Sequence, residues 1–168
     1  MSYGSDSISI KDAERVDCAS IRQLALDANI DAWSESDYAD EISRRDSFVL
    51  KATVNGDLTG FLVARIVPGD GEYVDVEIYN IAAQPLHRRR GVGSSLLANL
   101  LDRLTKRRVG NVWLEVRESN LEAISFYLRH GFIAEVTRPN FYSNPSENAV
   151  IMRLRLRHSE AFQNRNNA

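Results

Sequence analysis

Cysteine is almost missing from this chain of 168 residues, because Cys18 is the only one. No disulfide can form within the chain, and a reducing compartment fits this composition better than secretion. Long apolar runs are missing as well. No segment approaches the roughly 20 apolar residues of a membrane-spanning helix, and the N-terminus has no basic flank before an apolar stretch. We therefore expect a soluble, cytoplasmic protein that does not contact a membrane.

An excess of one charge is also missing. The formal net charge is −2, whereas a dedicated nucleic-acid-binding domain is commonly strongly basic. The composition therefore argues against direct binding of nucleic acid, and the arginines at 88–90 are a local feature. The chain does have a hydrophobic content of 43%, which is enough for one sizeable core, so we expect a single domain.

Hydrophobic periodicity divides the chain into strands and helices in the order β-α-α-β-β-β-α-β-α-β-β. This order predicts an α/β fold built on a mixed sheet with helices on both faces. We expect one domain over residues 8–157, with loose polar tails at 1–7 and 158–168. The predicted strands are 8–13, two arms of a hairpin within 47–67 with its turn at Asn55-Gly56, 73–83, 111–116, 133–138 and 149–157; the helices are 14–29, a short one after Ser34, one from Gly91 to Gly110 and one within 118–132; a loop is expected at 139–148.

The segment RRRGVG at residues 88–93 lies between a predicted strand and a predicted helix. The first amide groups of a helix have no partner inside it and, together with the helix dipole and nearby guanidinium groups, favour an anion such as phosphate. Gly91 and Gly93 remove side chains that would keep the backbone away from such a ligand. The motif differs from a dinucleotide fingerprint and from a P-loop. By itself it leaves open a solvated arginine patch, a nucleic-acid contact or a simple turn.

This segment, with the strand before it, resembles the acetyl-CoA pyrophosphate loop, R-x-x-G-x-G, of the GNAT family of N-acetyltransferases. The resemblance covers most of residues 8–156. Three further stretches, AWSESDY at 32–38, WLEVRESNLEAISFYLRHGF at 113–132 and RPNFYSNPSENAVIM at 138–152, are similar to the RimI-type members, which acetylate protein N-termini, notably that of a small-subunit ribosomal protein. The resemblance implies the acetyltransferase fold and acetyl-CoA as the acetyl donor, with no metal.

The resemblance also implies which residues hold acetyl-CoA. The backbone at the end of the strand 73–83 would bind the pantetheine chain like an added strand, although a plain core strand would have the same side chains. The loop and the start of the next helix would bind the phosphates. These residues are Ile81, Ala82 and Ala83 in the strand, Arg88, Arg89, Arg90, Gly91, Val92, Gly93 and Ser94 in the loop and helix start, and Asn120 further along the chain.

Acetyl transfer to an amine needs a base for the ammonium proton and an acid for the leaving thiolate. Glu115 is a carboxylate in the apolar strand VWLEV, and burial would bring its pKa nearer the range of a working base. A salt bridge to a neighbour such as Arg117 is the structural alternative. Tyr127, on the helix after that strand, has a phenolic proton to give, although helical aromatics are commonly core residues. The resemblance implies Glu115 as general base, acting through water, and Tyr127 as general acid.

The acceptor site follows from the resemblance. Similar enzymes bind the acceptor between their first two helices and the loop that joins the last two strands, although exposed aromatics there can also simply cover a core. The residues implied here are Trp33, Tyr38, Glu77, Phe141 and Tyr142. We expect an enzyme that acetylates a protein N-terminus. The alternatives are a GNAT enzyme for lysine, a polyamine or another small amine, in which Glu77 is a candidate base, or a non-catalytic CoA-binding module.

Overall fold

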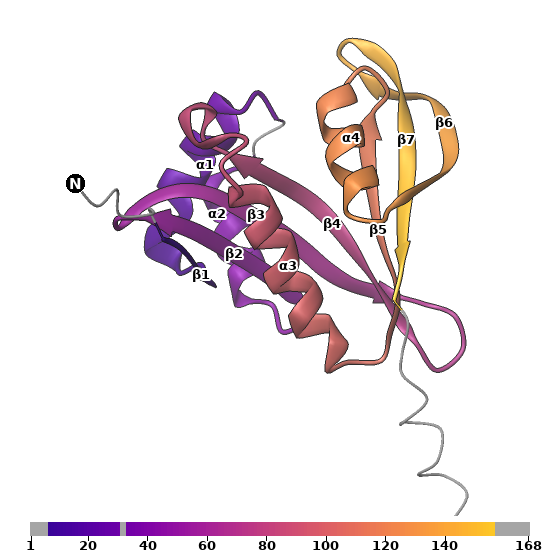
Figure 1. The fold of residues 1–168 in the computed structure, drawn as a ribbon, viewed down its shortest axis with the longest axis horizontal. Helices are drawn as coiled ribbons and strands as arrows, with labels where there is room; N and C mark the ends of the chain where they lie inside the picture. Colours follow the sequence, from indigo (N-terminus) through magenta and orange to yellow (C-terminus); the bar gives the residue numbers. More distant parts are fainter. Residues whose placement is uncertain (1–6, 31–32, 157–168) are drawn as a thin grey trace, which may run out of the picture. The chain divides into compact units, whose positions relative to one another are not determined.

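The computed structural model describes residues 7–30 and 33–156, and within them the elements follow the predicted order. In this part of the chain, seven strands and four α-helices form a mixed α/β fold, as predicted (Figure 1). The strand order is β1-β2-β3-β4-β5-β7-β6. The elements are β1 (Ile8–Asp12), η1 (Arg15–Asp17), α1 (Cys18–Asp27), α2 (Glu35–Ser43), β2 (Ser47–Val54), β3 (Asp57–Pro68), β4 (Val74–Ala83), η2 (Pro85–His87), α3 (Val92–Thr105), β5 (Val109–Arg117), α4 (Leu121–Arg129), β6 (Ile133–Ser143) and β7 (Ser146–Arg155).

The chain divides into two compact units. The first holds the described residues up to 65 together with 79–103, and the second holds 66–78 together with the described residues from 104 onward. Strands β3 and β4 each contribute residues to both units. The expectation of one domain over residues 8–157 stays a prediction, and the expected tails lie outside the described residues, apart from Ser7.

In the first unit, β2 lies between β1 and β3 and pairs antiparallel with both. Leu50 is opposite Leu62, and both are completely buried. The connection between the two strands has positive φ at Asn55 (53°) and Gly56 (93°). The hairpin turn predicted from this pair is therefore confirmed.

Helices cover both faces of the first unit's sheet. Phe61 and Val63 of β3 belong to a buried cluster with α1 and α2. On the opposite face of the strand, Gly60 lies against α3. A Cβ atom at Gly60 would be 2.5 Å from Cγ1 of Val92 and 2.8 Å from the carbonyl oxygen of Ala82. Only glycine allows the start of α3 to approach the sheet this closely.

In the second unit, β5 is the central strand. It pairs parallel with β4, where Val76 lies opposite Val112, and antiparallel with β7. Asp75 of β4 is buried, and its carboxylate accepts hydrogen bonds from the backbone N–H of Asn111 (2.9 Å), from that residue's amide group (3.1 Å) and from Nε1 of Trp113 (2.7 Å). These bonds satisfy the buried charge and join the start of β4 to β5.

The prediction of a loop at 139–148 is wrong. β6 continues to Ser143 and β7 begins at Ser146, so the two strands form a hairpin. Pro139 and the polar residues after it resemble a loop in sequence, but the strand accommodates them through a shift of register between Arg138 and Tyr142. Phe141 and Tyr142, two of the residues predicted to contact the acceptor, therefore lie on strand β6 and not in a loop.

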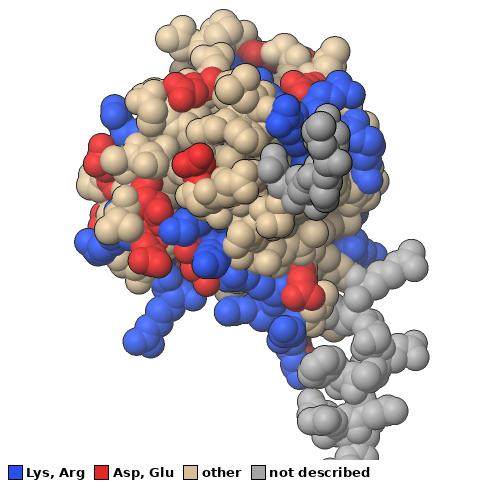
Figure 2. All heavy atoms as spheres, turned by 60° about the vertical axis from the view of Figure 1, so that its left-hand side comes forward, with Lys and Arg blue, Asp and Glu red and all other residues tan. Residues whose placement is uncertain are grey.

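Figure 2 shows basic and acidic side chains intermixed over one face. No helix in residues 7–30 and 33–156 is long and apolar enough to cross a membrane. The same residues contain no group of three or more His, Cys, Asp or Glu side chains that could hold a metal ion.

Candidate active site

The predicted phosphate loop lies in the first unit between η2 and α3. Residues 88–91 lead into the helix, whose first turn is closed by a bond from the backbone N–H of Ser95 to the carbonyl oxygen of Gly91 (2.9 Å). The amides of residues 92–94 come before this bond and have no acceptor inside the helix. Gly91 has a φ of 88°, and a Cβ atom there would meet only Ile8, at 3.7 Å. Backbone conformation, not space, therefore requires glycine at this position.

Three arginines precede these amides in the sequence. Arg88, Arg89 and Arg90 are exposed, and none of them forms an ion pair with another residue in the described part of the chain. Arg89 has a positive φ of 59°, which is uncommon for a residue other than glycine. The side chain of Val92 is buried, so this residue can offer only its backbone to a ligand. The loop thus combines free amides with uncompensated positive charge, which suits a phosphate group.

The end of β4 leads into this loop. Ala82 is buried, and its carbonyl oxygen is the atom that lies close to Gly60. The backbone N–H of Gln84 donates to the carbonyl oxygen of Thr59 (2.8 Å), which holds the end of β4 beside β3. Contacts of Ile81, Ala82 and Ala83 with pantetheine stay a prediction.

Glu115 lies on β5 in the second unit, with its side chain 23% exposed. Its neighbours Leu114 and Val116 are buried, which confirms the alternation expected for this strand. Burial raises the pKa of Glu115; the positive charge of Arg138 lowers it and the negative charge of Glu77 raises it, and the net effect is upward. A carboxyl group in this setting takes up a proton more readily than an exposed one.

The ion-pair partner of Glu115 is on β6 and not on β5. Nη1 of Arg138 is 2.7 Å from Oε1 of Glu115. Arg117, the neighbour considered from the sequence, contacts Glu147 instead, at 3.4 Å. Glu115 therefore does form a salt bridge, but its partner is Arg138, 23 positions away in the sequence, and not Arg117.

Tyr127 is buried on the inner side of α4, 5% exposed. Its ring contacts those of Phe126 (centroids 5.2 Å apart) and Phe132 (5.3 Å) in edge-to-face arrangements. Tyr127 is more buried than its neighbour Phe126. Burial raises the pKa of Tyr127, so the phenol keeps its proton at neutral pH.

Asn120 is the N-cap of α4. Its Oδ1 accepts a hydrogen bond from the backbone N–H of Ala123 (3.1 Å). This cap satisfies one of the unpaired amides of the helix start and explains the residue type structurally. The amide nitrogen of Asn120 is not used by the cap, and its contact with the cofactor stays a prediction.

The two acceptor residues predicted on the first unit have different positions. Tyr38, on α2, is completely buried and packs edge-to-face against Phe61 (5.9 Å between centroids). The structure therefore places Tyr38 in the core. Trp33 is half-buried beside it, with ring centroids 5.5 Å apart, and also lies 5.9 Å from the ring of Tyr79 on β4. Tyr38 supports Trp33 and does not itself form the surface.

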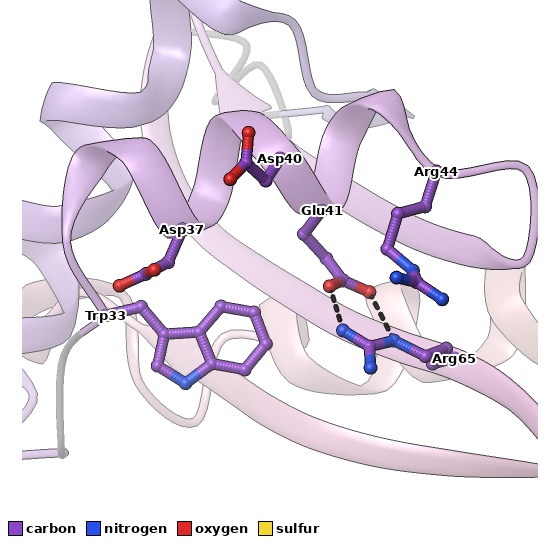
Figure 3. A pocket seen from close by; sticks show the side chains of 6 residues that line it. All are labelled: Trp33, Asp37, Asp40, Glu41, Arg44 and Arg65. Atoms are coloured by element: carbon purple, nitrogen blue, oxygen red, sulfur yellow. Dashed lines mark hydrogen bonds and ion pairs between the residues drawn. The ribbon is translucent and has the colours of Figure 1, made fainter.

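Trp33 borders a cavity of about 550 Å³ in the first unit (Figure 3). Glu41 and Arg65, which both line the cavity, form a bidentate ion pair, with Nε of Arg65 2.9 Å from Oε1 of Glu41. Burial alone would raise the pKa of Glu41, but hydrogen bonds from Arg65 and Ser47 and the charge of Arg65 outweigh it and lower the pKa. The lining residues are Trp33, Asp37, Asp40, Glu41, Arg44 and Arg65.

Sequence reasoning missed most of this cavity. Glu41 follows Tyr38 by one helical turn, so its place on the inner face of α2 could have been found from spacing. Arg65 interrupts the apolar run FLVARIV, which is itself a signal. Nothing local, however, indicates that these two residues meet, because they are 24 positions apart.

Three acceptor candidates remain, all in the second unit: Glu77 lies on β4, and Phe141 and Tyr142 lie at the end of β6. Phe141 is 42% exposed, and the guanidinium of Arg138 lies 5.2 Å from its ring centroid. The guanidinium of Arg117 lies 4.0 Å from the ring of Tyr142. Both aromatic residues are thus held by arginines that also contact carboxylates.

Comparisons with known proteins agree with the predicted family. The sequence model of the acetyltransferase (GNAT) family matches residues 18–132. The ribosomal protein bS18-alanine N-acetyltransferase of Escherichia coli (strain K12) is 33% identical over 147 residues, which are 86% of this chain and 95% of that protein. The crystal structure of the Escherichia coli ribosomal-protein-S18-alanine N-acetyltransferase has a TM-score of 0.80 at 31% identity and covers 91% of this chain and 96% of its own. Ard1 from Thermoplasma volcanium has a TM-score of 0.77 at 28% identity, covering 90% and 99%.

The ion pair in the cavity yields a stability prediction. Replacing Arg65 with methionine leaves the Glu41 carboxylate, 3% exposed, without its cation. We expect the free energy of unfolding at neutral pH to fall by about 1 to 3 kcal/mol, because a buried charge without its partner is costly. In the native protein, the contribution of Glu41 is complete above the unfolded pKa of 4.5 and is lost as the pH falls through the lower folded value. In Arg65→Met, burial instead raises this pKa, so the variant regains stability on acidification.

Chemical denaturation over a range of pH measures both effects. Arg108→Met is the matched control, because its ion pair with Glu72 is exposed on both sides (54% and 77%) and contributes little. Equal losses in the two variants would contradict the assigned role of the Glu41–Arg65 pair.

Proposed function

The chain belongs to the acetyltransferase (GNAT) family, and we propose that it transfers the acetyl group of acetyl-CoA to the N-terminal α-amino group of a protein. The observation that carries this proposal is the 33% identity to a bS18-alanine N-acetyltransferase over 86% of the chain. A ribosomal protein is the acceptor that this relative suggests. The cytoplasm, which holds such acceptors, is the compartment we propose.

The first unit supplies the groups expected for the donor. The free amides at the start of α3 and the exposed arginines at 88–90 fit the phosphates of acetyl-CoA in number and in sign. The positive φ of Gly91 turns the backbone where these groups meet. Backbone groups of residues 81–83 bind the pantetheine arm, and one of their amides polarises the acetyl carbonyl.

The second unit supplies the proton-transfer groups. Glu115 takes a proton from the acceptor ammonium group through water, and the free amine nitrogen then attacks the acetyl carbonyl carbon. As the new C–N bond forms and the C–S bond breaks, the thiolate of coenzyme A takes a proton from the hydroxyl of Tyr127. The nitrogen loses its second proton as it becomes the amide, this proton restores the phenol of Tyr127 through solvent, and Glu115 releases its own proton to water. The upward pKa shift of Glu115 favours its role as base, because the carboxyl group binds a proton more readily, and Tyr127 carries at neutral pH the proton that its role requires.

Each unit has an aromatic residue that is a candidate for contact with the acceptor peptide. Trp33 borders the cavity of the first unit, and Phe141 is the exposed aromatic residue of the β6–β7 hairpin. An aromatic surface binds the first side chain of the peptide, while the carboxylates Asp37 and Asp40 at the cavity favour a peptide with basic residues further along.

A panel of N-terminal peptides incubated with acetyl-CoA tests the function itself. We expect mass spectrometry to find the acetyl group on the α-amine and not on lysine side chains, with the fastest transfer to peptides that carry basic residues after the N-terminus. Peptides with a blocked α-amine and a free lysine are the control. Acetylation of these at an equal rate would favour a lysine acetyltransferase and contradict the proposal.

The phosphate loop is tested by ligand-dependent thermal stability. Acetyl-CoA at about 100 times its Kd should stabilise the native protein by about 2.7 kcal/mol, because it binds only the folded state. Gly91→Val should abolish this stabilisation, since valine disfavours the positive φ. Gly71→Val is the matched control: Gly71 also has a positive φ (63°) and open space around it, but lies in the loop before β4. If acetyl-CoA protects Gly91→Val as well as it protects Gly71→Val, the loop does not bind the phosphates.

The two proton-transfer roles have separate tests. Glu115→Gln should reduce kcat by about 10²- to 10⁴-fold with little change in acetyl-CoA affinity, as is typical of the loss of a general base. Tyr127→Phe keeps the ring packing and removes only the hydroxyl, so it should slow turnover without a large loss of stability. A thioester with a more acidic thiol should rescue Tyr127→Phe and not Glu115→Gln. Near-normal rates in both variants at saturating peptide would show that neither residue is catalytic.

A further inference from the structure

The charge state of Glu115 depends on residues from two other strands. Glu77 on β4 acts on it as a like charge and Arg138 on β6 as an opposite charge, while Ile151 on β7, the residue opposite Glu115, is apolar. Burial and Glu77 both favour the protonated carboxyl, whereas Arg138 favours the carboxylate. A general base must start without a proton. Of these influences, the charge of Arg138 is the one that favours the deprotonated form of Glu115.

Arg138 also contacts the hairpin surface assigned to the acceptor. Its guanidinium reaches Oε1 of Glu115 at 2.7 Å and lies 5.2 Å from the ring centroid of Phe141. One side chain therefore connects the candidate base with an exposed aromatic residue. A planar guanidinium suits both contacts, because it can donate hydrogen bonds in its plane and stack through its face.

The hairpin that carries Arg138 pairs with β5 through β7 and is hydrogen-bonded to the segment before α4. Oε1 of Glu147 accepts a hydrogen bond from the backbone N–H of Ser119 (2.6 Å). The side chain of Asn148 donates to Glu118 (2.9 Å), and its Oδ1 accepts from the backbone N–H of Asn140 (3.1 Å). Two of these bonds hold the start of β7 against the segment before α4, and the third joins β7 to Asn140, two residues after Arg138 in β6.

Stability alone does not account for this ion pair. The side chain of Arg138 is 54% exposed, and exposed pairs contribute roughly 0 to 1 kcal/mol to folding. Its charge also acts on the half-buried Glu115, where it lowers the proton affinity of the carboxylate.

We propose that Arg138 is a positioning residue for acetyl transfer: from its place on the β6–β7 hairpin, beside Phe141, it holds the Glu115 carboxylate ionised so that this group can accept a proton. The proposal rests on the proposed role of Glu115 as the base. It assigns to the hairpin a part in the reaction besides binding the acceptor.

The pH dependence of Arg138→Met tests the proposal. Without the cation, Glu115 keeps its proton to a higher pH, so kcat/KM at about pH 6 should fall by roughly threefold to tenfold, while rates in alkaline buffer stay near those of the native enzyme. Arg138→Lys retains the charge and should restore the acidic side of the profile. Arg155→Met removes an exposed arginine from β7 and is the matched control, with an expected unchanged profile.

A titration of the Glu115 carboxyl by carbon-13 NMR separates this proposal from the assignment of the base. Arg138→Met should raise the midpoint of the Glu115 signal, identified by its loss in Glu115→Gln, whether or not Glu115 is the base. An unchanged midpoint would overturn the proposal. A raised midpoint with an unchanged kcat/KM profile would overturn it as well, and normal turnover of Glu115→Gln in the same assay would show that the role of Glu115 is at fault.

Discussion

The absence of a side chain at Gly60 is the constraint on which the donor half of the site depends. A methyl group at this position would overlap both Val92 at the start of α3 and the carbonyl oxygen of Ala82 at the end of β4. The helix start and the strand end are the segments proposed to bind the phosphates and the pantetheine arm. One glycine in the neighbouring strand therefore sets how close these two segments come to each other.

Two glutamates show how neighbours decide the chemistry of a carboxyl group. Glu41 is the more deeply buried, yet its pKa is lowered, because Arg65 and Ser47 bind the carboxylate. Glu115 is less buried, but a single half-exposed arginine opposes both burial and the charge of Glu77, and its pKa is raised. Burial alone would have ranked them the other way round. Complete pairing makes Glu41 a structural ion, and incomplete pairing leaves Glu115 able to exchange a proton.

The order of elements and the Asn55-Gly56 turn were predictable, because periodicity and turn chemistry are local properties of the sequence. The β6–β7 hairpin was not, since Pro139 and the polar residues after it usually indicate a loop, and pairing with β7 overrides this tendency. The ion-pair partners were not predictable either. Arg138 reaches Glu115 across 23 positions, and only the register of the sheet brings such residues together.

The strand order also has a consequence for behaviour in concentrated solution. In the part of the chain that the structure describes, β6 is the last strand of the sheet and pairs only with β7. Such a strand offers unpaired backbone groups to a second molecule, and its side chains are exposed along nearly its whole length. Pro139, which has no N–H to donate, and the charged Glu135 and Arg138 interrupt this edge. Pro139, Glu135 and Arg138 thus make pairing of this edge with a second molecule less favourable.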